Sequence, residues 1–266
     1  MARKKGGGGG RQRARQRQQY DELDKYPVMP PHAFARIVRD KQTLNIIYQI
    51  IEPPLTKKEQ EQRDEIMDIF IRSLTANIEE IDSNPEAYVR TAMDKVIKSY
   101  SMKINKKSKS KLFYYLRRDL IGYGKMDVLM NDVNVEDISL DGTNVPIFAY
   151  HRKFESVETT CVWETDEELE SYVIKLAQRC GKHISVAEPL LDATLMDGSR
   201  IVMKLGHEIS TRGSAFCIRR FKDDPFSPAD IVAFRTMSSL MVAYLWIAFQ
   251  NEVPMLFVGG TASGKT

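Results

Sequence analysis

The amino-acid sequence predicts an α+β fold in which a helical N-terminal unit precedes a strand-rich unit, followed by the first strand and loop of an α/β domain. Three observations predict this order. Apolar residues recur at helical spacing before residue 98, short apolar runs separated by turn residues follow residue 122, and a glycine-rich loop lies at the C-terminal end.

Length and composition set broad limits on the class of protein. The 266 residues can form one large domain or two smaller ones, and 42% hydrophobic with 28% charged residues is ordinary for a soluble globular protein. No segment approaches the roughly 20 apolar residues that span a bilayer. The basic N-terminus continues into glycines and glutamines instead of an apolar core, which excludes a secretory signal. We therefore expect a cytoplasmic protein.

The cysteines and histidines show no metal-ligand pattern. Cys161, Cys180 and Cys217 are widely spaced, and no histidine lies at ligand spacing from another histidine or from a cysteine. The sequence therefore predicts neither a metal-ligand cluster nor a disulfide framework.

Residues 1–30 are predicted to be a flexible basic tail. Up to Gln19 they contain arginines, lysines and a run of glycines but no acid, a composition that cannot bury enough apolar surface to fold alone. Two interpretations stay open, a solubilising appendage or a segment attracted to anionic lipid headgroups. No specific nucleic-acid partner is predicted, because no aromatic residues alternate with the charges.

Residues 31–121 are predicted to form a helical unit after one short strand. The strand covers Thr43–Ile51 and ends before Pro53-Pro54. Thr56 and Glu59 have the spacing of a capping box at a helix start, and Pro85 suits the first turn of a second helix. The apolar faces of the two helices consist of Ile66, Ile69, Phe70, Leu74 and Ile78, and of Val89, Met93, Val96 and Ile97.

The segment Lys98–Arg118 is strongly basic and contains no acid, while Leu112–Leu116 adds apolar and aromatic residues. One interpretation is a solvated helix face with a basic loop. The other is a second surface for membranes or acidic partners.

Residues 122–222 are predicted to form an α+β domain. Short strand-like runs are separated by turns at Asp141-Gly142 and Asp197-Gly198, and one helix covers Asp166–Cys180. The expected strands are Asp137–Leu140, Val145–Tyr150, Phe154–Trp163, Leu190–Met196, Arg200–Leu205 and Phe216–Phe221.

Residues 223–236 are predicted to be a linker with a short helix that starts at Ser227-Pro228. Residues 237–266 then contain a largely apolar helix, Ser238–Asn251, and a short buried strand, Pro254–Val258, directly before the glycine-rich loop. We expect the faces of this helix to pack against a nucleotide-binding domain.

The loop has the residue spacing of a phosphate-binding loop. Its glycines bring backbone N–H groups close to phosphate oxygens, Lys265 would reach the outer phosphates of ATP, and the Thr266 hydroxyl would bind Mg²⁺. The alternative is a glycine-rich turn after a strand. The loop consists of Gly259, Gly260, Thr261, Ala262, Ser263, Gly264, Lys265 and Thr266.

Four segments upstream of the loop narrow this interpretation. In order, and followed by GGTASGKT, they resemble the ATPases of type II secretion and type IV pilus systems, and within that superfamily the archaeal flagellar (archaellum) motor ATPase. The resemblance runs from about Thr43 to Thr266. The four segments are Gly124–Ile138, Val145–Arg152, Pro189–Arg200 and Gly213–Phe221.

The resemblance implies an N-terminal domain joined to a RecA-like ATPase domain. It further implies a homo-hexameric ring, peripheral at the inner face of the cell membrane, beneath a polytopic platform protein. In that family, arginines of the N-terminal domain cover the bound ATP. By motif match the candidates here are Arg200 in DGSR and Arg219 or Arg220 in CIRRF. A guanidinium can contact phosphate oxygens at two points and offset the charge that builds up during transfer.

Each arginine also has a structural alternative. Arg200 could simply end a hairpin, and Arg219 and Arg220 could lie outward on an edge strand. A two-residue turn at Asp197-Gly198 would hold Arg200 near a strand start, which favours contact with the nucleotide. Because side chains alternate along a strand, only one residue of the pair can face the nucleotide. The acidic residues Asp132, Glu136 and Asp192 are interpreted as turn and surface residues.

The family's acidic box, Walker B strand and histidine box lie downstream of the loop and are not in the 266 residues. Hydrolysis requires magnesium and an oriented water, so we expect no ATPase activity from this chain alone and a loosely held segment from Pro254 onward. We expect an incomplete reading frame or an N-terminal portion. An archaeal pilus-assembly or type II secretion ATPase stays open as an alternative, as does a non-catalytic module that docks to the membrane platform.

Overall fold

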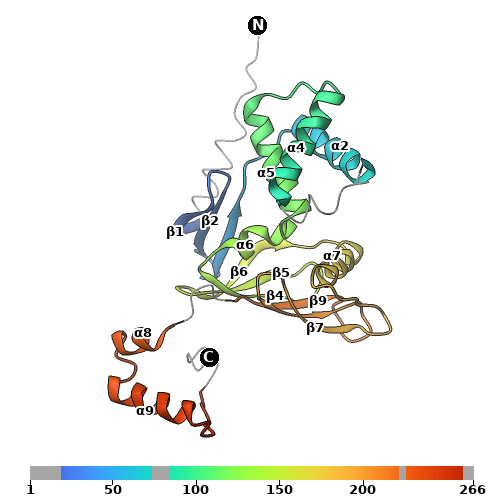
Figure 1. The fold of residues 1–266 in the computed structure, drawn as a ribbon. Coiled ribbons are helices and arrows are strands. Elements are labelled where there is room, and N and C mark those ends of the chain that lie inside the picture. Colours follow the sequence, from blue (N-terminus) through green and yellow to red (C-terminus); the bar gives the residue numbers. More distant parts are fainter. Residues whose placement is uncertain (1–18, 74–83, 222–225, 260–266) are drawn as a thin grey trace. The chain divides into compact units, whose positions relative to one another are not determined.

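A computed structural model describes residues 19–73, 84–221 and 226–259 of the chain (Figure 1). The chain divides into two compact units, one ending at Phe221 and the other beginning at Lys222. Each unit is described by itself.

The first unit is built around a nine-stranded sheet with the strand order β1-β2-β3-β6-β5-β4-β9-β8-β7. Neighbouring strands are antiparallel except β3 and β6, which are parallel. This parallel pair joins the β1–β3 meander to the rest of the sheet. The strands are β1 Tyr20–Met29, β2 Ala33–Asp40, β3 Ile46–Ile51, β4 Val135–Leu140, β5 Pro146–His151, β6 Glu155–Val162, β7 Leu190–Thr194, β8 Arg200–Lys204 and β9 Ala215–Arg219.

Alternation along the strands gives the sheet a buried face and, at its β8–β9 end, an exposed face. In β8, Ile201 and Met203 are buried, whereas Arg200 is exposed. The buried face packs against α7 (Asp166–Arg179) and lies near the short helices η1 and α6 (Figure 1). These short helices are η1 Gly124–Met126 and α6 Asp127–Asn131. The exposed face carries the outward side chains of β8 and β9, including those of Arg200 and Arg219.

Three helices between β3 and β4 form a helical unit with a core of its own. They are α2 (Lys57–Ser73), α4 (Pro85–Ser99) and α5 (Lys106–Leu120). The predicted capping box is confirmed, because the Thr56 N–H donates to the Glu59 carboxylate (2.8 Å) and the Glu59 N–H donates to the Thr56 hydroxyl (3.3 Å). Pro85 opens α4 as predicted. Leu74 and Ile78 lie outside the described residues.

Two predicted boundaries in the N-terminal region are wrong. The range predicted as a tail, residues 1–30, contains strand β1, and the range predicted as helical, residues 31–121, begins with the unpredicted strand β2. The strand predicted at Thr43–Ile51 is confirmed as β3, which begins at Ile46. β1 reads YDELDKYPVM, which is rich in residues of low strand propensity. Its hydrogen-bonded pairing with β2 along the whole strand outweighs that propensity. Residues 1–18 lie outside the described part of the chain.

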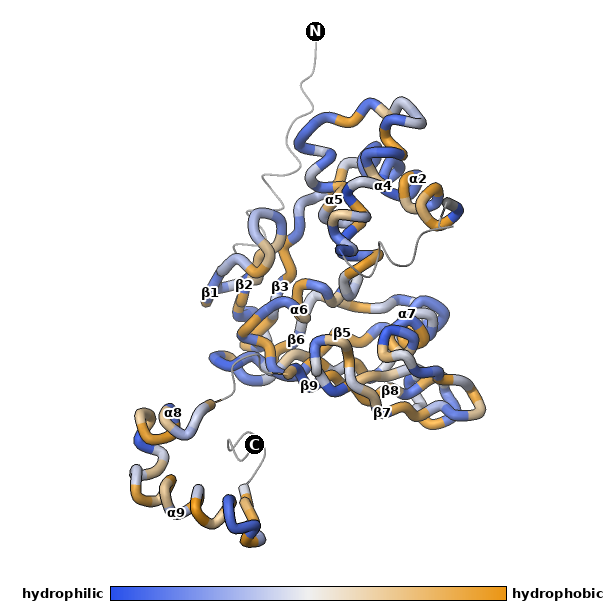
Figure 2. The backbone as a smooth tube through the Cα atoms, in the orientation of Figure 1, coloured by the Kyte–Doolittle hydropathy of each residue, from blue (hydrophilic) through white to orange (hydrophobic). Residues whose placement is uncertain are grey.

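The described part of the second unit contains α8 (Pro228–Ala233) and α9 (Ser239–Gln250). Both predicted helix starts are confirmed, since the Ser227 and Ser238 hydroxyls accept backbone N–H groups in the first turn of each helix. Figure 2 shows hydrophobic residues along α9, and large side chains such as those of Leu240 and Trp246 are exposed. None of the described helices has the length and apolar content needed to cross a bilayer.

The strand predicted at Pro254–Val258 is not formed. No secondary structure is assigned to these residues, and Leu256 and Val258 are 89% and 85% exposed. A strand requires a hydrogen-bonded neighbour, and the described residues of this unit contain none.

Candidate functional site

Arg200 is the first residue of β8 and follows a tight hairpin. The predicted two-residue turn is wrong, because the Leu195 N–H donates to the Ser199 carbonyl (2.8 Å), which leaves a three-residue loop. Gly198 closes this loop at φ +84°, a conformation that glycine adopts without strain. The buried Ser199 hydroxyl donates to Asp197 and accepts the Phe221 N–H. Arg200 therefore extends from a hydrogen-bonded hairpin instead of a long loop.

Arg200 and Arg219 lie directly opposite each other on β8 and β9. They are paired in the strand register, and both are exposed on the same face of the sheet. On the next strand, β4, Asp137 is paired with Arg219, and the Arg219 Nε lies 3.1 Å from the Asp137 Oδ1. Among the described residues the side chain of Arg200 has no hydrogen-bond or ion-pair partner. We call Arg200, Arg219 and Asp137 the arginine row.

The arginine row has an excess of positive charge. Like charges directly opposite on neighbouring strands repel each other, and one carboxylate stands beside two guanidinium groups. An anion with several oxygens would offset this repulsion and could accept from both arginines. The row therefore has the chemistry of a phosphate or polyphosphate site.

Arg220 lies elsewhere. Its side chain is half-buried, and its Nη1 donates to the backbone carbonyls of Val135 (2.9 Å) and Asp132. Alternation along β9 places Arg219 outward and Arg220 against the loop that precedes β4. The structure thus brings Arg200 and Arg219 together and keeps Arg220 apart from them.

Asp132 is the centre of a buried hydrogen-bond network, and its interpretation as a turn or surface residue is wrong. It is 2% exposed, and its Oδ2 accepts from the hydroxyls of Tyr26 (2.7 Å) and Tyr48 (2.6 Å). Its Oδ1 accepts the Asn134 N–H (2.9 Å). The network ties β1 and β3 to the loop before β4, close to the residues that hold Arg220.

His151 extends this network. Its Nδ1 accepts the backbone N–H groups of Lys153 (3.1 Å) and Phe154 (3.3 Å). Its Nε2 therefore carries the proton and donates to the Tyr26 hydroxyl oxygen (2.9 Å). Burial lowers the pKa of His151, although the charges of Asp132 and Asp24 oppose the effect. The folded protein therefore holds this ring in its neutral form.

This pKa shift predicts a loss of stability on mild acidification. Above the unfolded-state pKa of about 6.5 the ring is neutral in both the folded and the unfolded protein. Its contribution to the free energy of unfolding is then fully present. As pH falls below it, the unfolded chain binds the proton first and the free energy of unfolding decreases. Urea unfolding at pH 8 and pH 5.5 should show a smaller decrease for His151→Gln than for the unmodified protein.

His183 provides the control for this measurement, because its side chain is exposed and has no hydrogen bond or ion pair among the described residues. His183→Gln should leave the pH dependence in place. Equal pH dependence in His151→Gln and the unmodified protein would contradict the assignment.

The residues of the predicted phosphate-binding loop lie almost entirely outside the described part of the chain. Of the eight residues only Gly259 is described, without assigned secondary structure. The placement of Lys265, Thr266 and Gly260–Gly264 relative to the arginine row therefore stays a prediction. Within the described residues no group of three or more His, Cys, Asp or Glu side chains could hold a metal ion.

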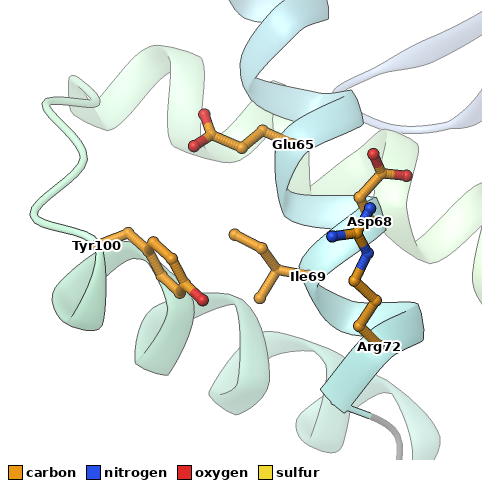
Figure 3. Close-up of a pocket in the computed structure, with 5 residues that line it drawn as sticks. All are labelled: Glu65, Asp68, Ile69, Arg72 and Tyr100. Atoms are coloured by element: carbon orange, nitrogen blue, oxygen red, sulfur yellow. The ribbon is translucent and has the colours of Figure 1, made fainter.

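A surface pocket lies on the helical unit and not at the arginine row. It is lined by Glu65, Asp68, Ile69 and Arg72 of α2 and by Tyr100 after α4 (Figure 3). None of the predicted site residues contributes to it. Its two carboxylates would repel a phosphate group, so it does not compete with the arginine row as a phosphate site.

Asp137 is a part of the arginine row that sequence reasoning missed. Its role depends on the β4–β9 register, which joins residues 82 positions apart. A strand-like segment around Asp137 could be expected from the sequence, but no local pattern identifies its neighbour. The alternation of apolar and polar residues in Asp137–Leu140 was the one available signal.

Three proteins of Methanocaldococcus jannaschii are similar to this chain in sequence, and all three are described as uncharacterized. MJ1288 is 42% identical over 164 residues, MJ0900 is 31% identical over 246 residues and MJ0781 is 34% identical over 160 residues. These matches cover 61%, 91% and 58% of this chain, but 65%, 43% and 22% of the respective relatives. The chain thus spans less than two thirds of each of these relatives.

No family model matches the chain. Among solved structures, the VirB11 ATPase of the Brucella suis type IV secretion system, in complex with sulphate, aligns with a TM-score of 0.36 and 14% sequence identity. The alignment covers 48% of this chain and 42% of that chain.

Proposed function

We propose that this chain is the ATP-binding N-terminal portion of a secretion-type motor ATPase that energises assembly of the archaellum. The observation that carries the proposal is the arginine row, in which two guanidinium groups share one exposed face with a single carboxylate. The four sequence segments and the phosphate-binding loop described above support it independently. The same parts would serve an archaeal pilus-assembly or type II secretion ATPase.

The proposed mechanism gives each predicted site residue a role toward ATP. Lys265 and the loop glycines would bind the phosphates, Thr266 would hold Mg²⁺, and Arg200 and Arg219 would bind phosphate oxygens from the sheet domain. The metal ion would neutralise phosphate charge when bound. Arg200 and Arg219 orient the phosphates and offset their charge by bidentate hydrogen bonds. The homo-hexamer and the membrane platform protein belong to the same proposal.

A second candidate function is docking to an anionic surface through the helical unit. The first turn of α5 carries Lys106, Lys107 and Lys109 and no acid, although acidic residues would stabilise that helix end. Lys106 and Lys107 are exposed and have no ion-pair partner among the described residues. Docking of this kind requires neither Lys265 nor the arginine row, which separates it from the ATPase proposal.

Polyphosphate binding tests the first proposal. Each of Arg200→Gln and Arg219→Gln should weaken tripolyphosphate binding about fivefold, and the double variant about thirtyfold, because each exposed charge-assisted contact contributes on the order of 1 kcal/mol. Isothermal titration calorimetry on the whole chain measures this.

Arg152→Gln is the matched control, because it removes an equally charged surface side chain that is paired with Glu136 and is not part of the row. It should change binding less than twofold, the scale of a single exposed charge. Unchanged binding in the Arg200→Gln, Arg219→Gln double variant would exclude the proposed role of the row.

A further inference from the structure

Asp137 is the carboxylate of the arginine row and contacts one of its two arginines, Arg219. We infer that Asp137 is a latch that holds Arg219 when no polyphosphate is bound and competes with polyphosphate for it. This inference rests on the proposed function, because it concerns the regulation of the same phosphate site. It adds a residue of β4 to a site otherwise made from β8 and β9.

The strand register places Arg219 where Asp137 and a polyphosphate would compete for it. Arg219 is paired on one side with Asp137 and on the other with Arg200, so its guanidinium lies between a carboxylate and a like charge. With no anion present, both neighbours favour the same arrangement, since Asp137 attracts Arg219 and Arg200 repels it. The observed contact between the Arg219 Nε and the Asp137 Oδ1 at 3.1 Å is that arrangement.

The contact is suited to release. The side chains of Arg219 and Asp137 are 74% and 38% exposed, so water screens the ion pair and its strength is small. Among the described residues, Asp137 makes no other side-chain hydrogen bond. A polyphosphate that contacts both arginines gains several charge-assisted hydrogen bonds and can outcompete a single exposed carboxylate. A monovalent anion gains fewer.

The partners of Arg219 and Arg220 differ, and this difference supports a switching role for the Arg219–Asp137 contact. Arg220 is held by the backbone carbonyls of two buried residues, Asp132 before β4 and Val135 at its start, and these carbonyls carry no net charge. Those acceptors cannot be exchanged for a ligand without unfolding the loop. Arg219, one residue earlier, is held only by a side chain on the solvent-exposed face.

Removing the charge of Asp137 while keeping a hydrogen-bond acceptor tests the latch. Asp137→Asn should tighten tripolyphosphate binding about two- to fivefold, the fold-change that corresponds to one exposed ion pair. In an Arg219→Gln background the same substitution should have no effect, because nothing remains to be released. Calorimetric titration of the four proteins with tripolyphosphate measures both.

Asp141→Asn is the control for overall charge, since Asp141 is exposed just beyond β4 and has no side-chain partner among the described residues. Tightening by Asp137→Asn that persists in the Arg219→Gln background, or equals that of Asp141→Asn, would overturn the latch. So would weaker binding by Asp137→Asn, which would make Asp137 a positioning residue. Binding that does not depend on Arg219 at all would instead overturn the proposed function. Asp137→Ala gives a second variant, and thermal unfolding checks that each protein is folded.

Discussion

Replacing Asp132 with alanine is expected to lower the free energy of unfolding by about 3 to 5 kcal/mol. The substitution removes the acceptor of two tyrosine hydroxyls and one backbone N–H. Tyr48 is completely buried, so its hydroxyl would lose a partner where water cannot replace it. A buried polar group left unpaired costs about 1 to 3 kcal/mol, and bonds to a charged acceptor lie at the upper end of the range. Urea unfolding followed by circular dichroism measures the loss.

Asp192→Ala provides the comparison, since Asp192 lies exposed on β7 and its side chain has no hydrogen bond or ion pair among the described residues. It should change the free energy of unfolding by less than about 0.5 kcal/mol. Similar losses for the two alanine variants would contradict the hub role of Asp132.

Arg220→Met is expected to lower the free energy of unfolding by about 2 to 4 kcal/mol. Methionine keeps much of the apolar stem but donates no hydrogen bond, so the carbonyls of Val135 and Asp132 lose their partner. Because these carbonyls lie just before β4 and at its first residue, the loss acts next to the Asp132 network. Chemical denaturation at constant pH is the measurement.

Arg219→Met is the matched variant one position earlier. Its side chain is exposed and bound to a single carboxylate, so stability should change by no more than about 1 kcal/mol. The two substitutions are therefore expected to affect different properties. Arg220→Met should reduce stability, whereas Arg219→Met should reduce polyphosphate binding. Equal stability losses would show that both side chains are structural.

The strands of the central sheet could be predicted because their sequences alternate. In β8 and β9 the residues Ile201, Met203 and Ile218 are buried on one side, and the predicted segments match the observed strands within two residues at each end. β1 and β2 could not be predicted in the same way. The two strands pair with each other in a hairpin, and the Tyr26 hydroxyl on β1 also donates to Asp132, which lies 106 residues away in the sequence.

The candidate site was predictable in composition but not in arrangement. Alternation requires Arg219 and Arg220 to point to opposite faces, but the burial of β9 decides which of them is exposed. Likewise the acidic residues Asp132, Asp137 and Asp192 are similar in sequence context. Asp132 is buried, Asp137 binds Arg219, and Asp192 is exposed. These differences arise from tertiary contacts.

The parallel pairing of β3 with β6 has a consequence for how the chain folds during synthesis. The backbone N–H of Ile50 donates to the Thr160 hydroxyl across 110 residues, and the whole helical unit is synthesised between these two strands. Until β6 has left the ribosome, β3 has an unpaired edge that can associate with other chains. Closing so distant a pair is also entropically slow. The helical unit has local contacts and should therefore fold first. The pairing of β3 with β6, which completes the sheet, should follow.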